Sequence, residues 1–110
     1  MIRLELKKSD GLYCGFSCKG HAEYADPGED IVCSAVSALT QTCVLGLTEE
    51  IGLACGVSID AEDGIQLILD RDTSRENAEK ADLIIRVMVI GLREIEKSYP
   101  GTLKIQNREV

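Results

Sequence analysis

The single histidine of the chain, His21, precedes Cys33 by twelve residues, and the two residue types together could form a catalytic dyad. A thiolate is a strong nucleophile, and an imidazole gains or loses a proton near physiological pH. Asp30 is a natural N-cap for a helix that begins at residue 31. Cys33 would then lie in the first helical turn, where free backbone N–H groups and the positive end of the helix dipole favour a thiolate and could stabilise an oxyanion.

The residues alone leave two other interpretations open. In the first, His21 is an ordinary exposed loop residue and Cys33 is a small side chain that packs an uncharged helix. In the second, Cys14, Cys18, His21 and Cys33 supply four zinc ligands. Residues four apart on a strand lie about 13 Å from each other, which is too far for one ion. We therefore expect no metal site and no cofactor.

Two further side chains could support the dyad. Ser37 lies one turn beyond Cys33 on the same helical face and could orient a substrate or the histidine, although serines in buried helices more often bond their own backbone. Asp30 could orient His21, with capping as its default role. The acidic segment that contains Glu23, Asp26 and Glu29 suits a basic peptide, but such segments are usually only solvated.

The first half of the chain predicts a β-hairpin, a loop and a helix. Apolar residues alternate with charged ones from Ile2 to Leu6 and again from Leu12 to Cys18, so a second strand should end near Gly20. On that alternation His21 points away from the apolar face. Residues 22–30 predict a loop, and the 18 uncharged residues 31–48 predict a helix buried between a sheet and another surface, because serine, threonine and glutamine dilute the run too much for a bilayer.

The second half predicts another hairpin, a second long helix and a last strand. Residues 55–70 indicate two strands that turn near Asp63 and Gly64. Thr73 and Glu76 have the spacing of a capping box, and an apolar stripe at steps of three and four runs from Ala78 until Pro100–Gly101. Residues 102–106 alternate as a strand. The predicted fold class is α/β of the α+β type, with a small, mostly antiparallel sheet and two long helices in the order ββαββαβ, as one domain over residues 1–110.

Composition restricts the partners. The net charge is −7 and the pI is about 4.6, which argues against direct binding of nucleic acid. Five cysteines are an odd number, and the first residues show no secretory signal, so we expect free thiols in a cytoplasmic protein with no membrane segment. The apolar stripe of the second helix and the uncharged surface of the first favour a two-fold homodimer through one of these helices, although core packing explains both patterns equally well.

The segment GHAEYADPGEDIVCSAVSAL closely resembles the signature of the bacterial ribosomal-processing cysteine proteases, the Prp family. In that signature G-H-A is followed by a short loop and by G-x-D-I-V-C-A-A-V-S. Ser34 stands where the family commonly has alanine. "GLTEEIGL" and the order of elements are also similar, so the resemblance covers nearly the whole chain. The matched positions include Gly20, His21, Ala22, Gly28, Asp30, Cys33 and Ser37.

The resemblance implies a small dimeric cysteine endopeptidase that removes the N-terminal extension of a bacterial large-subunit ribosomal protein during ribosome maturation. It implies that Cys33 is the nucleophile and His21 the general base, that Asp30 and Ser37 support them, and that the loop of residues 22–30 gates the substrate. The family's substrates carry an apolar, Phe-containing extension ahead of a basic mature tail. The alternative is a non-catalytic adaptor or assembly factor that binds a ribosomal protein through the same loop and helix.

Overall fold

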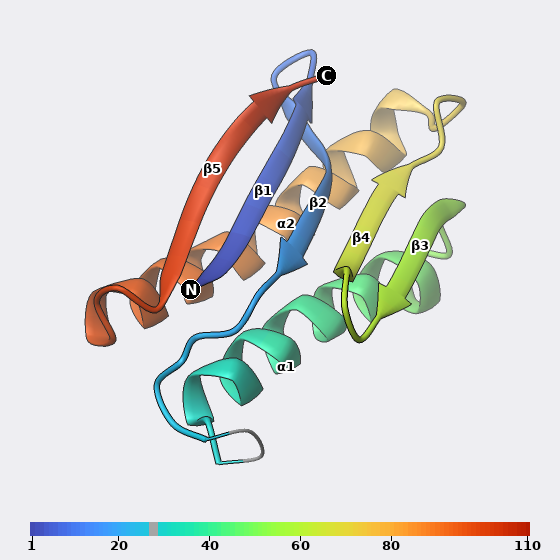
Figure 1. Cartoon of the computed structure of the whole chain (residues 1–110). Coiled ribbons are helices and arrows are strands. Elements are labelled where there is room, and N and C mark those ends of the chain that lie inside the picture. The colour runs from blue at the N-terminus through green and yellow to red at the C-terminus, as the bar shows by residue number, and fades with distance from the viewer. Residues whose placement is uncertain (27–28) are drawn as a thin grey trace.

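In the computed structural model, which describes residues 1–26 and 29–110, two helices pack against a five-stranded sheet (Figure 1). The chain runs through β1 (Ile2–Ser9), β2 (Leu12–Lys19), α1 (Ile31–Leu45), a π-helical turn η1 (Gly46–Glu50), β3 (Cys55–Asp60), β4 (Gly64–Leu69), α2 (Arg75–Ser98) and β5 (Leu103–Glu109). The strands lie in the order β3-β4-β2-β1-β5. Only the β1–β5 pair is parallel among these, because α2 carries the chain back to the far side of β1. The predicted fold class and element order are confirmed.

The core lies between the sheet and the helices. In the β1–β2 hairpin Leu4 lies opposite Cys18 and Leu6 opposite Phe16, and all four side chains are buried, as their alternation predicts. The apolar stripe of α2 covers the same face of the sheet. Its fully or nearly buried members are Ala81, Ile85, Met88 and Leu92. This stripe is therefore core and cannot also be a dimer surface.

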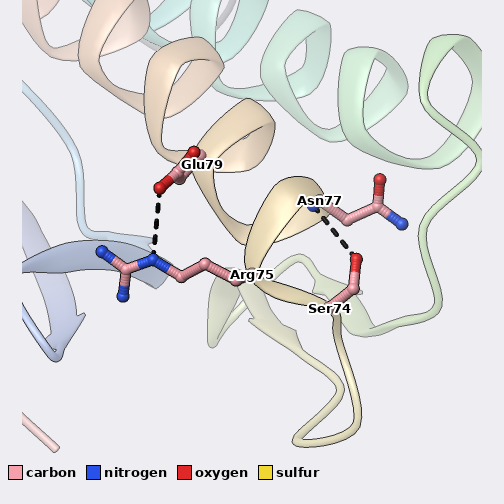
Figure 2. A network of polar contacts seen from close by, with 4 residues as sticks. All are labelled: Ser74, Arg75, Asn77 and Glu79. Atoms are coloured by element: carbon pink, nitrogen blue, oxygen red, sulfur yellow. Dashed lines mark hydrogen bonds and ion pairs between the residues drawn. The ribbon is translucent and has the colours of Figure 1, made fainter.

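The start of α2 differs from the prediction by one residue. Its N-cap is Ser74, whose Oγ accepts a hydrogen bond from the Asn77 backbone N–H at 3.2 Å, as Figure 2 shows. The predicted capping box from Thr73 is wrong, since the Thr73 hydroxyl instead donates to the Asp70 carbonyl at 2.6 Å in the preceding turn. An ion pair between Arg75 Nε and Glu79, 3.2 Å apart, follows in the first turns of the helix (Figure 2).

Helix α1 is buried on one face rather than all round. Its core side chains pack beside α2, where Leu39 lies against Gly91 and Gly46 lies against Ile84. Ile31 and Leu45 are more than half exposed, so the predicted burial between two surfaces is wrong for that face. The stretch Ile31–Glu50 contains an 18-residue window with a mean hydropathy of 1.6, so by length and composition it is apolar enough to cross a membrane. Helices in the core of a folded protein meet the same criterion, and the packing of α1 against α2 favours a core helix over a membrane span.

The β3–β4 hairpin closes tightly against the end of β2. The Asp60 carboxylate caps its turn by accepting hydrogen bonds from the N–H groups of Glu62 at 2.7 Å and Asp63 at 3.1 Å. Gly64 has a φ of +73°, and a Cβ there would overlap the Cys18 carbonyl oxygen. Glycine is thus required twice, by the backbone angle and by the close approach. The turn predicted near Asp63 and Gly64 is confirmed, and it lies beside the chain that leaves β2.

Candidate active site

The chain leaves β2 through a turn that only glycine allows. Gly20 has a φ of +95°, and a Cβ there would overlap the Met1 carbonyl oxygen. The turn leaves His21 exposed, as the strand alternation predicts, whereas Ala22 is buried. Further along, the Tyr24 ring packs edge-on against Tyr99 at the end of α2, with 5.1 Å between the ring centroids. The crossing from β2 to α1 is thus attached to the body of the protein on both sides of Glu23.

One carboxylate joins this crossing to the start of α1. Asp30 Oδ1 accepts hydrogen bonds from the N–H groups of Val32 and Cys33, both at 3.0 Å. Its Oδ2 accepts from Tyr24 N–H at 2.9 Å and from Ala25 N–H at 3.3 Å. The side chain is only 7% exposed, and burial by itself would raise its pKa. The four N–H donors outweigh burial and hold the Asp30 pKa below its ordinary value, so the carboxylate stays ionised at neutral pH.

This arrangement corrects the expected source of the oxyanion site. The N–H groups of Val32 and Cys33 already donate to Asp30, so they are not free to bind a developing negative charge. The expectation that helix-start amides serve an oxyanion is therefore wrong for these two groups. Asp30 acts on the backbone as the N-cap that the sequence predicts.

The backbone amide that reaches the sulfur comes from the crossing instead. Ala22 N–H donates to Cys33 Sγ at a distance of 3.2 Å. This donor belongs to the residue that follows His21. The structure thus brings the two predicted catalytic residues into one neighbourhood. Within the described residues no hydrogen bond joins the His21 ring to the Cys33 sulfur, so proton transfer requires the exposed ring to turn toward it.

A cavity of about 330 Å³ opens beside the sulfur, and three parts of the fold line it. The end of β2 and the following turn contribute His21, helix α1 contributes Cys33, and the β3–β4 hairpin forms the opposite wall. Apolar side chains make up much of the interior, whereas the acidic turn of the hairpin lies at one side. The lining residues include Ile2, Cys18, Lys19, Gly20, His21, Cys33, Val36, Ser37, Thr40, Gln41, Ile59, Asp60, Ala61, Glu62, Gly64 and Ile65.

Of the remaining predicted site residues, one lines the cavity and one lies outside the part of the chain that the structure describes. Ser37 lines the cavity, and its hydroxyl accepts a hydrogen bond from Gln41 Nε2 at 2.8 Å. Two other hydroxyls of α1 bond back to the helix backbone: Thr40 donates to the Val36 carbonyl at 2.9 Å and Ser34 to the Asp30 carbonyl at 3.2 Å. Gly28 lies outside the described residues. Among the residues described, no three histidine, cysteine or acidic side chains form a group that could hold a metal ion.

Sequence reasoning missed the hairpin wall. Ile59, Asp60 and Glu62 line the cavity, although they lie more than twenty residues beyond Cys33 in the chain. The sequence predicts the hairpin itself, but no local signal says that its turn lies beside His21. The close approach of Gly64 to the Cys18 carbonyl produces this arrangement, and it depends on the pairing of β4 with β2.

The other four thiols are held in their neutral form. Burial, with a smaller effect from nearby Cys33, raises the pKa of Cys18 to about 11. Burial, with a smaller effect from Cys55, raises the pKa of Cys43 to about 12. Burial also raises the pKa of Cys14 and Cys55. Cys14 and Cys55 are as partly exposed as Cys33 and line other cavities. Cys33 differs from them in lining the cavity that His21 also lines, with Ala22 N–H donating to its sulfur.

Comparisons with known proteins identify the family of the chain. Residues 1–104 match the family model described as Cysteine protease Prp. The ribosomal processing cysteine protease Prp of Bacillus subtilis is 31% identical over 108 residues, which cover 96% of each chain. A crystal structure of the Staphylococcus aureus ribosomal processing protease Prp, in complex with a covalently linked product peptide, superimposes with a TM-score of 0.83. It is 26% identical and the match covers 98% of this chain and all of that one.

Together the fold and these matches define a cysteine protease. The chain belongs to the Cysteine protease Prp family. A second S. aureus Prp structure, in complex with a substrate peptide, has a TM-score of 0.78 at 24% identity and supports the same fold. The family resemblance drawn from residues 20–39 is confirmed.

The environments of the five thiols predict an order of alkylation. At pH 6.5 iodoacetamide should modify Cys33 at least about tenfold faster than Cys18 or Cys43, because thiols with a pKa of about 11 or 12 expose almost no thiolate at that pH. It should also modify Cys33 faster than Cys14 and Cys55, because burial raises the pKa of both. Peptide mapping by mass spectrometry after timed quenching gives the five rates. Equal labelling of Cys33 and the half-exposed Cys55 would contradict the assignment.

Proposed function

We propose that this protein is a cysteine endopeptidase that removes the N-terminal extension of a bacterial large-subunit ribosomal protein during ribosome maturation. The observation that carries the proposal is the contact between Ala22 N–H and Cys33 Sγ beside a cavity that His21 also lines. The names of the relatives, which describe ribosomal processing proteases, support the substrate class. Residues 1–110 act as one peptidase domain in the cytoplasm.

In the proposed reaction, His21 accepts the proton of the Cys33 thiol, and the sulfur attacks the scissile carbonyl carbon. The carbonyl oxygen becomes an oxyanion, and Ala22 N–H is placed to donate to it once the sulfur has formed its bond to carbon. One such donor is worth roughly 3 kcal/mol in studied enzymes. His21 then returns the proton to the leaving amine, and a thioester remains on Cys33. Water, deprotonated by His21, hydrolyses the thioester and restores the thiol.

The other predicted residues position this chemistry. Asp30 acts on the backbone, because its carboxylate holds the crossing and the first turn of α1 together. Gly20 supplies the turn that starts the crossing, and Ala22 supplies the buried N–H donor. Ser37 offers a hydroxyl to the substrate on the helix side of the cavity. The loop of residues 22–30 gates access, with Gly28 among the residues matched by the family signature.

Charge around the cavity suits a basic substrate. Asp60 and Glu62 of the hairpin turn line it, and the crossing adds Glu23 and Asp26 on the exposed side. Hydrogen bonds from Asp63 N–H and Glu62 N–H lower the Asp60 pKa and outweigh the opposing effect of burial, so this carboxylate is ionised at neutral pH. A basic segment next to the scissile bond would thus meet negative charge on two sides.

The alternative function, a non-catalytic adaptor or assembly factor, uses the same surface without covalent chemistry. A peptide that spans the extension junction separates the two. The wild type should cut it, Cys33→Ala should abolish cutting, and His21→Ala should lower kcat/KM by about 10²- to 10⁴-fold, because general-base catalysis contributes that much. Cleavage is followed by chromatography and mass spectrometry.

Cys14→Ala serves as the matched control for that experiment, since it removes a partly exposed thiol that does not line this cavity and should cut as well as the wild type. Circular dichroism checks that each variant is folded. Undiminished cleavage by folded Cys33→Ala would end the proposed mechanism, and a wild type that binds the peptide without cutting it would favour the adaptor.

We also propose a homodimer, through a different surface from the stripe seen in the sequence. Leu83, Val87 and Ile90 form an exposed apolar stripe on α2, and Val87 is 62% exposed. Spacings of four and three residues put them on one helical face. Exposed Leu45 of α1 adds an apolar side chain on the neighbouring helix. Exposed apolar patches of this kind are typical of interfaces.

Sedimentation at micromolar concentration measures the oligomeric state. The wild type should sediment as a dimer, and Val87→Asp should shift it to the monomer without loss of helical signal, because a carboxylate would be buried without a partner. The control Lys104→Ala changes an exposed residue on β5, away from the stripe, and should leave the mass unchanged. A monomeric wild type would rule the dimer out.

A further inference from the structure

The two edges of the sheet differ in how well they are protected. β5 forms one edge and carries Lys104 and Arg108, the latter paired with Glu5 at 3.5 Å. β3 forms the other edge (Figure 1), and its six residues, Cys55–Asp60, contain no lysine, arginine or proline. Proteins usually block free edges with such residues, because unpaired N–H and C=O groups recruit other strands. The β3 edge is therefore open to a further strand.

The pairing of β3 with β4 tells which backbone groups face outward. Asp70 N–H donates to the Ala54 carbonyl at 3.1 Å, which makes this a hydrogen-bonded pair. Such pairs alternate along antiparallel strands, so Gly56, Ser58 and Asp60 bond to β4. The N–H and C=O groups of Cys55, Val57 and Ile59 then point to the free edge.

The same residues present apolar side chains. Val57 lies opposite Leu67 and Ile59 opposite Ile65, so both point to the face of the sheet that carries the helices. Val57 is nevertheless 40% exposed and Ile59 62% exposed. An added strand could therefore gain both backbone hydrogen bonds and apolar contacts at this edge.

This edge is continuous with the cavity of the nucleophile. Ile59 and Asp60, at the end of β3, line the cavity together with His21 and Cys33. In Figure 1 the same end of β3 and the turn after it lie over α1. A chain that follows the β3 edge toward the turn thus arrives at the cavity.

We propose that the substrate peptide binds as an added strand on the free edge of β3, with apolar side chains against Val57 and Ile59 and its scissile bond beside Cys33. The inference rests on the proposed function for the identity of the occupant. It adds the binding mode and the kind of segment recognised, which is an extended peptide with apolar residues at alternate positions. The backbone groups of Cys55, Val57 and Ile59 provide affinity, and the two apolar side chains select the sequence.

The test compares Val57→Pro with Val57→Ala in a Cys33→Ala background. Both changes remove part of the Val57 side chain that would contact the peptide, but only proline also removes the outward N–H of residue 57. Proline is tolerated at edge positions whose N–H faces away from the sheet. Fluorescence anisotropy with a labelled junction peptide should give a Kd about tenfold higher for Val57→Pro than for Val57→Ala, which is the order expected for losing a backbone hydrogen bond and blocking the edge. Urea unfolding verifies that the two variants are equally folded.

A second measurement varies the peptide instead of the β3 edge. Junction peptides methylated at one backbone nitrogen at a time should bind Cys33→Ala weakly when the methyl group is at every second position of the apolar segment and normally when it lies between them. Equal Kd values for the two Val57 variants, or no alternation among the methylated peptides, would overturn the strand addition. So would a shift in sedimentation for Val57→Pro without a change in Kd, because the edge would then serve a second copy of the chain. Failure of the wild type to cut a peptide that it binds would instead overturn the proposed function.

Discussion

The site depends on a single buried carboxylate that binds four backbone N–H groups from two parts of the chain. Asp30 satisfies Val32 and Cys33 at the start of α1 and Tyr24 and Ala25 in the crossing from β2. Buried N–H groups without partners are costly, so these donors favour one arrangement of the loop over many. Because the crossing is held there, Ala22 N–H lies 3.2 Å from the Cys33 sulfur, next to the histidine.

The first N–H groups of a helix could both anchor the local structure and contact the sulfur, but in this protein different N–H groups do these two things. The N–H groups of Val32 and Cys33 hold the structure together through Asp30, and the N–H group that contacts the Cys33 sulfur comes from the crossing between β2 and α1. An ionised Asp30 also puts a negative charge near the positive end of the helix dipole, where it is stabilised. Gly20 and Gly64 allow the close approaches that bring crossing, helix and hairpin turn around one cavity.

Much of the fold could be predicted from the sequence because its signals are local. Alternation from Ile2 to Leu6, the Asp63–Gly64 turn and the stop at Pro100 each depend on a few neighbouring residues. The N-cap of α2 was missed by one residue because Ser74 and Thr73 are chemically equivalent caps, and the turn bond to Asp70 decides between them.

The parts of the site that could not be predicted depend on residues far apart in the sequence. The resemblance in residues 20–39 names His21 and Cys33, but it does not show that Asp30 uses up the first-turn amides or that Ala22 faces the sulfur. The hairpin wall at Asp60 follows from the pairing of β4 with β2, which no local pattern encodes. The exposed stripe around Val87 was obscured by the longer stripe on the opposite side of the same helix, which forms the core.

The pH dependence of stability in wild type and Asp30→Asn tests the role of this carboxylate most directly. The folded pKa of Asp30 is lowered, so its contribution is complete above the unfolded value of about 3.9 and is lost as the pH falls through the folded value. Urea midpoints between pH 7 and pH 2.5 should therefore show a less stable Asp30→Asn at neutral pH and a difference that shrinks below about pH 4. Equal midpoints at pH 7, or a difference that stays constant down to pH 2.5, would contradict the account.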